Sequence, residues 1–210
     1  MKSSYAAVTL SASLYIAGIA FSADVDQDAT TDTQKKTLQT AIETCVSCHG
    51  IKGRSVSPTF PNLAAQTATY LELQLHAFKD QTRADPDAQA YMWGMASQLN
   101  DATISALAAY YSTQAGADGK SGNTTLIAQG KHIFDEGVPG RQVPPCASCH
   151  GAHAEGNGPF PRLAGQHAPY LLKQLIVIQS VLRTAPVMHG IIKDLTRDQM
   201  QSVVVYLESI

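Results

Sequence analysis

Apolar side chains recur every three or four residues in several segments of the chain, which is the spacing of one helix face. The pattern is clearest near the end of each half, at Ile104, Leu107, Ala108 and Tyr111 and again at Met200, Val203, Val204 and Leu207. Asn100 or Asp101, and Thr196, supply N-caps for these two helices. Earlier helices are expected at residues 38–44, 67–79, 126–134 and 168–181. Since no stretch alternates as a strand does, the pattern predicts an all-α fold.

The same motifs occur twice and in the same order. Residues 45–50 read CVSCHG and residues 146–151 read CASCHG, an offset of 101, while residues 60–66 and 160–166 read FPNLAAQ and FPRLAGQ, an offset of 100. Tyr-Leu-x-x-Gln-Leu begins at Tyr70 and Tyr170, Arg83 returns as Arg183, and Met-x-Gly begins at Met92 and Met188. Repetition of this kind indicates two homologous domains, which we place at residues 23–116 and 117–210. The Gly-rich segment 115–125 is expected to be an exposed connection, and the polar segment 24–34 a flexible N-terminus.

The first residues of the chain are predicted to form a signal peptide, which we place at residues 1–22. Lys2 precedes a mostly apolar stretch, and Ala20-Phe21-Ser22 fits a cleavage site with small residues at its outer positions. An uncleaved anchor is the alternative, but the stretch is short and contains Thr and Ser, which suits a membrane span poorly. The sequence therefore predicts export, with the periplasm as the final location.

The charge of the chain argues against a nucleic-acid partner. The formal net charge is −2 and the sequence pI is near 6.4, whereas nucleic-acid binders are usually basic. The two halves differ, because residues 23–116 hold 6 basic and 10 acidic side chains, and residues 117–210 hold 8 basic and 7 acidic ones. Such a polarised chain suits electron entry at one domain and exit at the other.

All four cysteines lie in the two Cys-x-x-Cys-His motifs, which are the attachment pattern of c-type haem. Two thiols one helical turn apart reach the two vinyl groups of a porphyrin, and the adjacent histidine reaches the iron. We therefore predict haem attachment at Cys45, Cys48, Cys146 and Cys149, with His49 and His150 as iron ligands. A redox disulfide lacks the βαβ setting that it requires. A zinc ribbon needs its cysteine pairs much closer together than they are here.

The second ligand of each iron is predicted to be methionine. Met92 and Met95 compete in the first half, but Met92 aligns with Met188 whereas Met95 aligns with Ile191, which cannot bind iron. Met92 and Met188 are therefore the predicted ligands, and Met200 is expected in the core. A methionine ligand raises the haem potential and closes the iron to other ligands.

Five histidines lie outside the two cysteine motifs, and a proline follows each motif histidine at a similar distance. No counterpart in the other half exists for the five remaining histidines, so we expect surface or supporting roles for His76, His132, His153, His167 and His189. Pro61 and Pro161 follow the motif histidines by 12 and 11 residues. Their carbonyls could accept a hydrogen bond from the histidine ring, or the prolines could simply stiffen a loop.

Together these motifs resemble the dihaem cytochrome c4 family over nearly the whole chain after the signal peptide. The resemblance implies two tandem class I cytochrome c-like helical domains, each wrapped around one covalently attached haem c. It implies a periplasmic electron carrier, not an enzyme, that passes electrons toward a terminal cytochrome oxidase in a respiratory chain. The donor would be a cytochrome bc-type complex or a small copper protein, and membrane contact would occur only through such partner complexes.

Related dihaem chains suggest an alternative, the electron-accepting subunit of a dehydrogenase such as a sulfide-oxidising flavocytochrome c. A dihaem peroxidase would need one open iron, and the symmetric methionines argue against it. Three features depart from strict repetition. Ala65 stands opposite Gly165, Gly130 has no counterpart, and the loop of residues 137–145 lengthens only the second half.

Overall fold

The computed structural model describes residue 1 and residues 24–210, with side chains from residue 31 onward. The predicted signal peptide, apart from Met1, lies outside the described residues. The all-α prediction is confirmed, since the described residues form helices and two isolated bridges, Val138–Val143 and Asn157–Phe160, but no strand. None of the described helices is both long and apolar enough to cross a bilayer.

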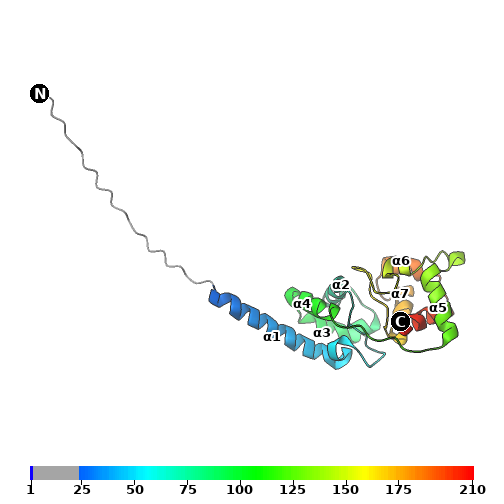
Figure 1. Ribbon diagram of the computed structural model, residues 1–210, viewed down its shortest axis with the longest axis horizontal. Helices are drawn as coiled ribbons and strands as arrows, with labels where there is room; N and C mark the ends of the chain where they lie inside the picture. The colour runs from blue at the N-terminus through cyan, green and yellow to red at the C-terminus, as the bar shows by residue number, and fades with distance from the viewer. Residues whose placement is uncertain (2–23) are drawn as a thin grey trace.

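Each half contains helices at corresponding places (Figure 1). The first half consists of α1 (Asp24–His49), the short η1 (Ile51–Gly53), α2 (Ala68–Lys79), the π-helical turn η2 (Ala88–Met92), α3 (Trp93–Ser97) and α4 (Asp101–Ser112). The second half consists of α5 (Thr124–Glu136), the short η3 (Pro139–Arg141), α6 (Ala147–His150), α7 (Ala168–Gln179), α8 (Pro186–Ile192) and α9 (Arg197–Ser209).

The prediction of a flexible segment at residues 24–34 was wrong. α1 is continuous from Asp24 to His49, and in Figure 1 it runs as one long helix into the first cysteine motif. The segment contains no Gly or Pro. Once the packed part of the helix has nucleated, each added residue gains a hydrogen bond and the helix propagates.

The predicted caps of the last helices are confirmed. The Asn100 side chain accepts a hydrogen bond from the Thr103 backbone at the start of α4. At the start of α9, Thr196 and Gln199 form a reciprocal capping box. These caps fix where the final helix of each half begins.

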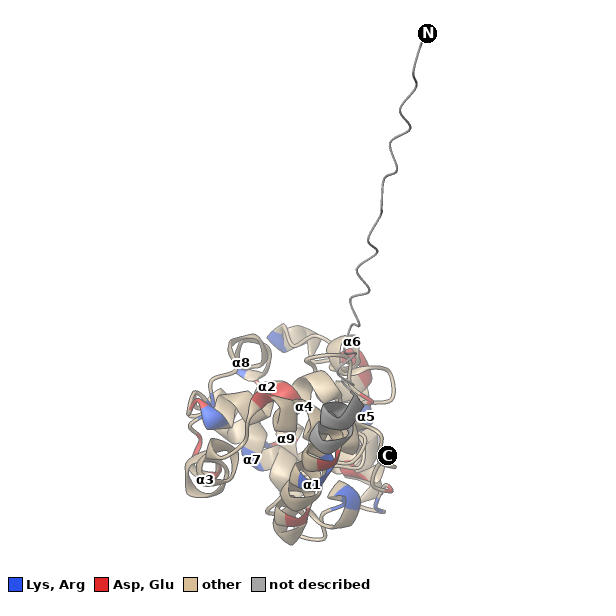
Figure 2. Cartoon of the chain, turned by 90° about the vertical axis from the view of Figure 1, so that its left-hand side faces the viewer, with Lys and Arg blue, Asp and Glu red and all other residues tan. Residues whose placement is uncertain are grey.

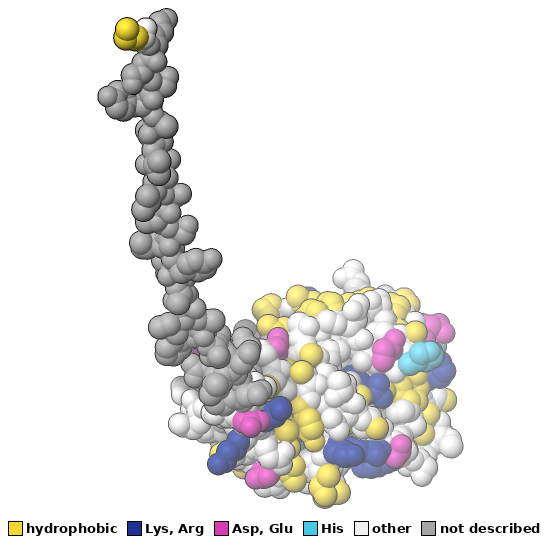
Figure 3. Space-filling view, turned by 60° about the vertical axis from the view of Figure 1, so that its left-hand side comes forward, with side chains coloured by type: hydrophobic (Ala, Val, Ile, Leu, Met, Phe, Trp, Pro, Cys, Tyr) yellow, Lys and Arg dark blue, Asp and Glu magenta, His cyan; other side chains and the backbone are white. Residues whose placement is uncertain are grey.

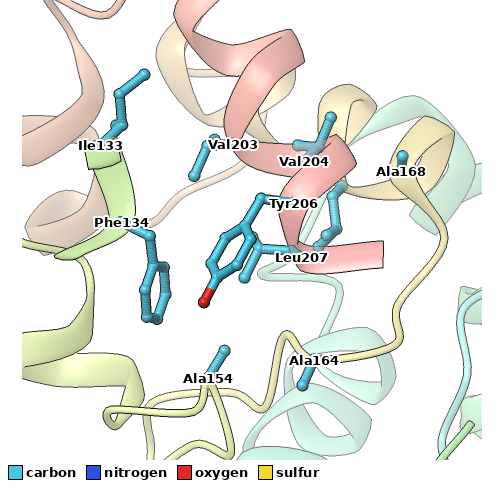
Figure 4. Close-up of a cluster of buried hydrophobic side chains, with 10 residues drawn as sticks. Ile133, Phe134, Ala154, Ala164, Ala168, Val203, Val204, Tyr206 and Leu207 are labelled. Carbon is cyan, nitrogen blue, oxygen red and sulfur yellow. The ribbon is translucent and has the colours of Figure 1, made fainter. Parts of the chain in front are cut away.

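The core of the second half lies between α5, α7 and α9 (Figure 4). Phe134 is fully buried, and its ring centroid lies 5.6 Å from that of Tyr206. Gly130 lets α5 approach α9 closely, because a Cβ at this position would lie 2.1 Å from the Ser202 carbonyl oxygen. Met200 is only 1% exposed in a neighbouring cluster, which confirms its predicted core position.

The first half packs α1, α2 and α4 around a smaller core of Ile42, Leu71, Leu107, Ala108 and Tyr111. A polar connection follows α4 and lies largely exposed up to Asn123, which caps α5. The exact domain boundary stays a prediction, at residues 116 and 117.

Repeated glutamines join the two halves by reciprocal hydrogen bonds. The Gln66 amide accepts from the backbone nitrogen of Arg162 at 2.6 Å and donates to its carbonyl at 3.0 Å. Gln166 makes the equivalent pair to the nitrogen and carbonyl of Asn62, at 2.9 and 3.0 Å. Gln66 and Gln166 occupy the same position in the repeat, so the interface has an approximate twofold arrangement.

The residues that follow these glutamines also cross the interface. The Thr67 hydroxyl donates to the carbonyl of Gly158 at 2.6 Å. Nε2 of His167 lies 3.0 Å from the carbonyl oxygen of Ser55, and His167 is only 2% exposed. The surface role considered for His167 is therefore wrong, because this residue is a buried contact between the halves.

Candidate haem-binding site

Each cysteine motif forms the end of a helix that turns sharply at glycine. Cys45, Cys48 and His49 lie in the last turn of α1, and the second motif forms the short α6. Gly50 and Gly151 adopt positive φ values of 76° and 85°. A Cβ at Gly50 would lie 2.1 Å from the Arg54 carbonyl oxygen, so this position needs glycine.

No disulfide joins any of the four cysteines. Burial raises the pKa of Cys146 to about 11, and burial also raises the pKa of Cys45. No cluster of three or more His, Cys, Asp or Glu side chains with metal-binding geometry occurs among the described residues. The structure thus gives no support to the disulfide or zinc interpretations of the motif.

Both motif histidines are buried and held by a proline carbonyl. Nδ1 of His49 lies 2.9 Å from the Pro61 oxygen, and Nδ1 of His150 lies 2.9 Å from the Pro161 oxygen. The carbonyl-acceptor interpretation of these prolines is therefore confirmed. Donation from Nδ1 fixes the tautomer and leaves Nε2 as the ligating atom. Burial lowers the pKa of both imidazoles, partly opposed by these hydrogen bonds, which favours the neutral form that binds metal.

An aromatic ring supports each histidine from the side. The Phe60 ring lies 6.1 Å from the His49 ring, and the Phe160 ring lies 6.4 Å from the His150 ring, both edge-on. The Phe-Pro dipeptide is repeated in the sequence, but the contact of each phenylalanine with a motif histidine was not predicted from it.

A cavity of about 690 Å³ extends beside both histidines and is lined by both halves. Met92 and Met188 contribute to the lining, whereas Met95 does not and is 56% exposed. Most of the other lining residues are apolar, among them Leu71, Phe78, Leu107, Leu171, Ile178, Val204 and Leu207. Each half therefore presents one histidine and one methionine to the same apolar cavity.

Different local structures position the two methionines. Met92 ends the π-helical turn η2, and the indole of the next residue, Trp93, donates to the Arg83 carbonyl at 2.8 Å. Met188 lies in α8, and Nδ1 of the next residue, His189, lies 3.0 Å from the Ile178 carbonyl. His189 does not line the cavity, and neither do the other four non-motif histidines.

Polar residues of the cavity wall gather where the two halves meet. Gln74 Oε1 accepts from Arg83 at 2.8 Å and from Arg183 at 2.9 Å. Gln174 Oε1 likewise accepts from Arg83 at 2.9 Å and from Arg183 at 2.7 Å. Both arginines are buried, and only one buried carboxylate, Asp85, pairs with either of them among the described residues.

Two further observations support a fit between these residues and bound haem. The buried arginines leave an excess of positive charge at the cavity wall, which suits the propionate carboxylates of haem. The Tyr111 hydroxyl is buried at the cavity and has no hydrogen-bond partner among the described residues. Burial raises the pKa of this phenol, which is protonated at neutral pH even without that shift and can donate to a bound group.

Comparison with known proteins identifies the family of the chain. The cytochrome c family matches the chain twice, at residues 36–114 and 127–210. A solved structure of cytochrome c4 from Acidithiobacillus ferrooxidans shares 42% identity and a TM-score of 0.75, covering 79% of this chain and 98% of that one. Cytochrome c4 from Stutzerimonas stutzeri is 33% identical over 183 residues, which is 82% of this chain and 87% of that protein.

A second kind of relative is also similar. A thiosulfate dehydrogenase electron acceptor from Thiomonas intermedia is 33% identical over 170 residues, covering 78% of this chain and 76% of that protein. The two cytochrome c matches imply two covalently bound haem c groups. The chain therefore belongs to the dihaem cytochrome c4 family and is a dihaem electron carrier.

Proposed function

We propose that the chain is a periplasmic carrier that passes electrons toward a terminal cytochrome oxidase and catalyses no reaction of its own. Thioether bonds from Cys45, Cys48, Cys146 and Cys149 would attach the two haems. His49 and Met92 would ligate one iron, and His150 and Met188 the other. The single observation that carries this proposal is the shared cavity wall, on which each half presents a histidine with fixed Nδ1 and a methionine.

When bound, haem c supplies a one-electron ferric/ferrous couple, and methionine ligation keeps its iron closed to other ligands. The chain's residues hold the imidazole orientation through Pro61 and Pro161 and keep water from the cavity with apolar side chains. A rigid ligand set of this kind changes little between redox states, which suits transfer and not substrate binding.

The surface is compatible with brief encounters between redox proteins. Figure 2 shows Lys and Arg scattered among Asp, Glu and uncharged residues, with no continuous basic face in that view. Figure 3 shows apolar side chains next to mixed charges on another face. We propose a cytochrome bc-type complex or a small copper protein as donor, with membrane contact only through such complexes and no nucleic-acid partner.

The alternative is the electron-accepting subunit of a dehydrogenase, such as a sulfide-oxidising flavocytochrome c. The similarity to a thiosulfate dehydrogenase electron acceptor supports this alternative class more directly than it supports the flavocytochrome itself. Rapid reduction by a purified thiosulfate or sulfide dehydrogenase, together with slow reduction by a bc-type complex, would favour the alternative over the respiratory route.

The test of the ligands uses absorption spectra of the haem-loaded protein. Met92→Ala and Met188→Ala should each remove about half of the sulfur-to-iron band of the oxidised form and allow carbon monoxide to bind one reduced haem. Met95→Ala is the matched control, because Met95 lies outside the cavity wall and should leave both signals unchanged. Carbon monoxide binding by the unaltered protein, or loss of the band in Met95→Ala, would refute the proposed ligand set.

A further inference from the structure

The buried polar cluster between the halves has a nearly symmetric arrangement of Tyr70, Gln74, Arg83 and their repeats Tyr170, Gln174 and Arg183. Each glutamine oxygen accepts from both arginines, as described above. Arg183 also donates to the Tyr70 hydroxyl at 2.9 Å. Because the repeat makes these residues equivalent, any difference between the two haem sites has to come from what surrounds them.

One buried carboxylate breaks this symmetry. Asp85 is 1% exposed and accepts from Nε of Arg83 at 2.9 Å. Counted from the arginines, its counterpart in the second half is Ala185. No carboxylate among the described residues forms an ion pair with Arg183, whose hydrogen bonds all go to neutral groups. The charge of Arg83 is therefore balanced within its own half, and the charge of Arg183 is not.

The segments that follow the two arginines extend this difference. The first half continues with ADPDAQAY before Met92, and the second half with TAPV before Met188. The second acidic residue of the longer segment, Asp87, lines the cavity and pairs with Lys173. Asp85 and Asp87 thus both belong to the half that contains Met92, and the shorter segment 184–187 of the other half has no acidic residue.

A loop that only the second half possesses is another difference between the two haem sites. Val143, Pro144 and Pro145 line the cavity beside Cys146, and Val143 is 3% exposed. In the first half α1 runs without interruption into Cys45, so no equivalent loop covers the cavity there. Excluding water favours the less charged, reduced form of an iron site.

We propose that Asp85 lowers the reduction potential of the first haem site relative to the second. This inference rests on the proposed function, because it requires one haem in each half. A buried negative charge stabilises the ferric state, which carries one more positive charge than the ferrous state. An electron shared within the chain therefore resides mainly in residues 117–210. A reduced donor protein supplies this electron and an oxidised acceptor protein removes it, and within the chain it moves from the couple of lower potential to the couple of higher potential.

The test is a redox titration of the haem-loaded protein, fitted as two one-electron steps. Asp85→Asn should raise the lower step and leave the upper step nearly unchanged. We expect the electron distribution between the halves to change roughly threefold to tenfold, which is the effect of one charge acting over roughly 12–25 Å at an effective dielectric constant of about 20. A tenfold change corresponds to about 59 mV for a one-electron couple.

Two further variants keep the proposal open to refutation if Asp85→Asn folds poorly. Ala185→Asp places a carboxylate on the second half and should lower only the upper step. Ala185 is the N-cap of α8, a position that accepts aspartate well, so this variant should fold. Asp101→Asn is the matched control, because it removes the same charge from an exposed site and should move neither step appreciably.

Several results would overturn the proposal. If Asp85→Asn raises the upper step, or if Asp101→Asn shifts the steps as much as Asp85→Asn does, Asp85 does not set the difference. If Ala185→Asp lowers the lower step, the order of the two sites is reversed. Two intact His/Met haem spectra alongside any of these results would leave the proposed function standing. Fewer than two haems would refute both together.

Discussion

Replacing Gln166 with alanine should weaken the interface between the two halves and destabilise the haem-loaded protein. The Gln166 amide accepts from the Asn62 backbone nitrogen at 2.9 Å and donates to the Asn62 carbonyl at 3.0 Å. Asn62 is 7% exposed, so water reaches these two groups poorly once the amide is removed. Each buried group left without a partner costs about 1–3 kcal/mol, so the two groups together give a loss of about 2–6 kcal/mol.

The structure also predicts an order among three alanine variants. Gln66→Ala should cost less than Gln166→Ala, because the backbone groups that it releases belong to Arg162, which is less buried than Asn62. Gln114→Ala should cost least, because the amide of Gln114 bonds within its own helical end and not across the interface. Gln114→Ala is therefore the matched control for loss of a glutamine side chain.

The assay is equilibrium unfolding in guanidinium chloride at pH 7, followed by circular dichroism and haem absorption. Gln166→Ala should lower the midpoint, and the loss of coupling should separate one transition into two. A destabilisation below about 1 kcal/mol, or one equal to that of Gln114→Ala, would refute the reasoning, because it would mean that the Asn62 groups find other partners without penalty.

Three further variants test other parts of the fold. His167→Gln should flatten the decline of stability with acid. Burial and the nearby Lys120 lower the pKa of His167, so the unaltered protein should lose stability as the pH falls below the unfolded value of about 6.5, as urea titrations from pH 7.5 to 5.5 would show. Phe134→Ala should cost about 3–5 kcal/mol in the same assay because the side chain is fully buried, and an effect under about 1 kcal/mol would contradict this packing. Gly130→Ala should separate α5 from α9 and cost at least about 1–3 kcal/mol, and unchanged thermal unfolding would show that the close approach does not matter.

Much of the candidate site could be predicted from the sequence because its chemistry is local. Cys45, Cys48 and His49 lie within one helical turn, so their joint role is visible without a fold. The repeat then selected Met92 over Met95, and the structure places only Met92 on the cavity wall. The helices and their caps were likewise predictable, since periodicity and capping depend on neighbouring residues.

Other features could not be predicted because they depend on residues far apart in the chain. The part of α1 that precedes residue 38 was not predicted, since the polar segment has no apolar stripe and helix propagation depends on the packed end. The burial of His167 was missed because its acceptor, Ser55, lies 112 residues away. The residue at the same position of the first half is Thr67 and not a second histidine. Comparison of the two halves therefore did not reveal that both side chains cross the interface.

The sequence by itself determined that the chain repeats, that both halves are helical, and where the cysteine motifs could attach haem. These conclusions rest on spacing within a few residues and on comparison of one half with the other. Only the tertiary structure decided that Arg83 and Arg183 share the same glutamine oxygens and that Asp85 balances one of them. Charge balance at a buried interface depends on which side chains meet in space, and the order of residues along the chain does not specify that.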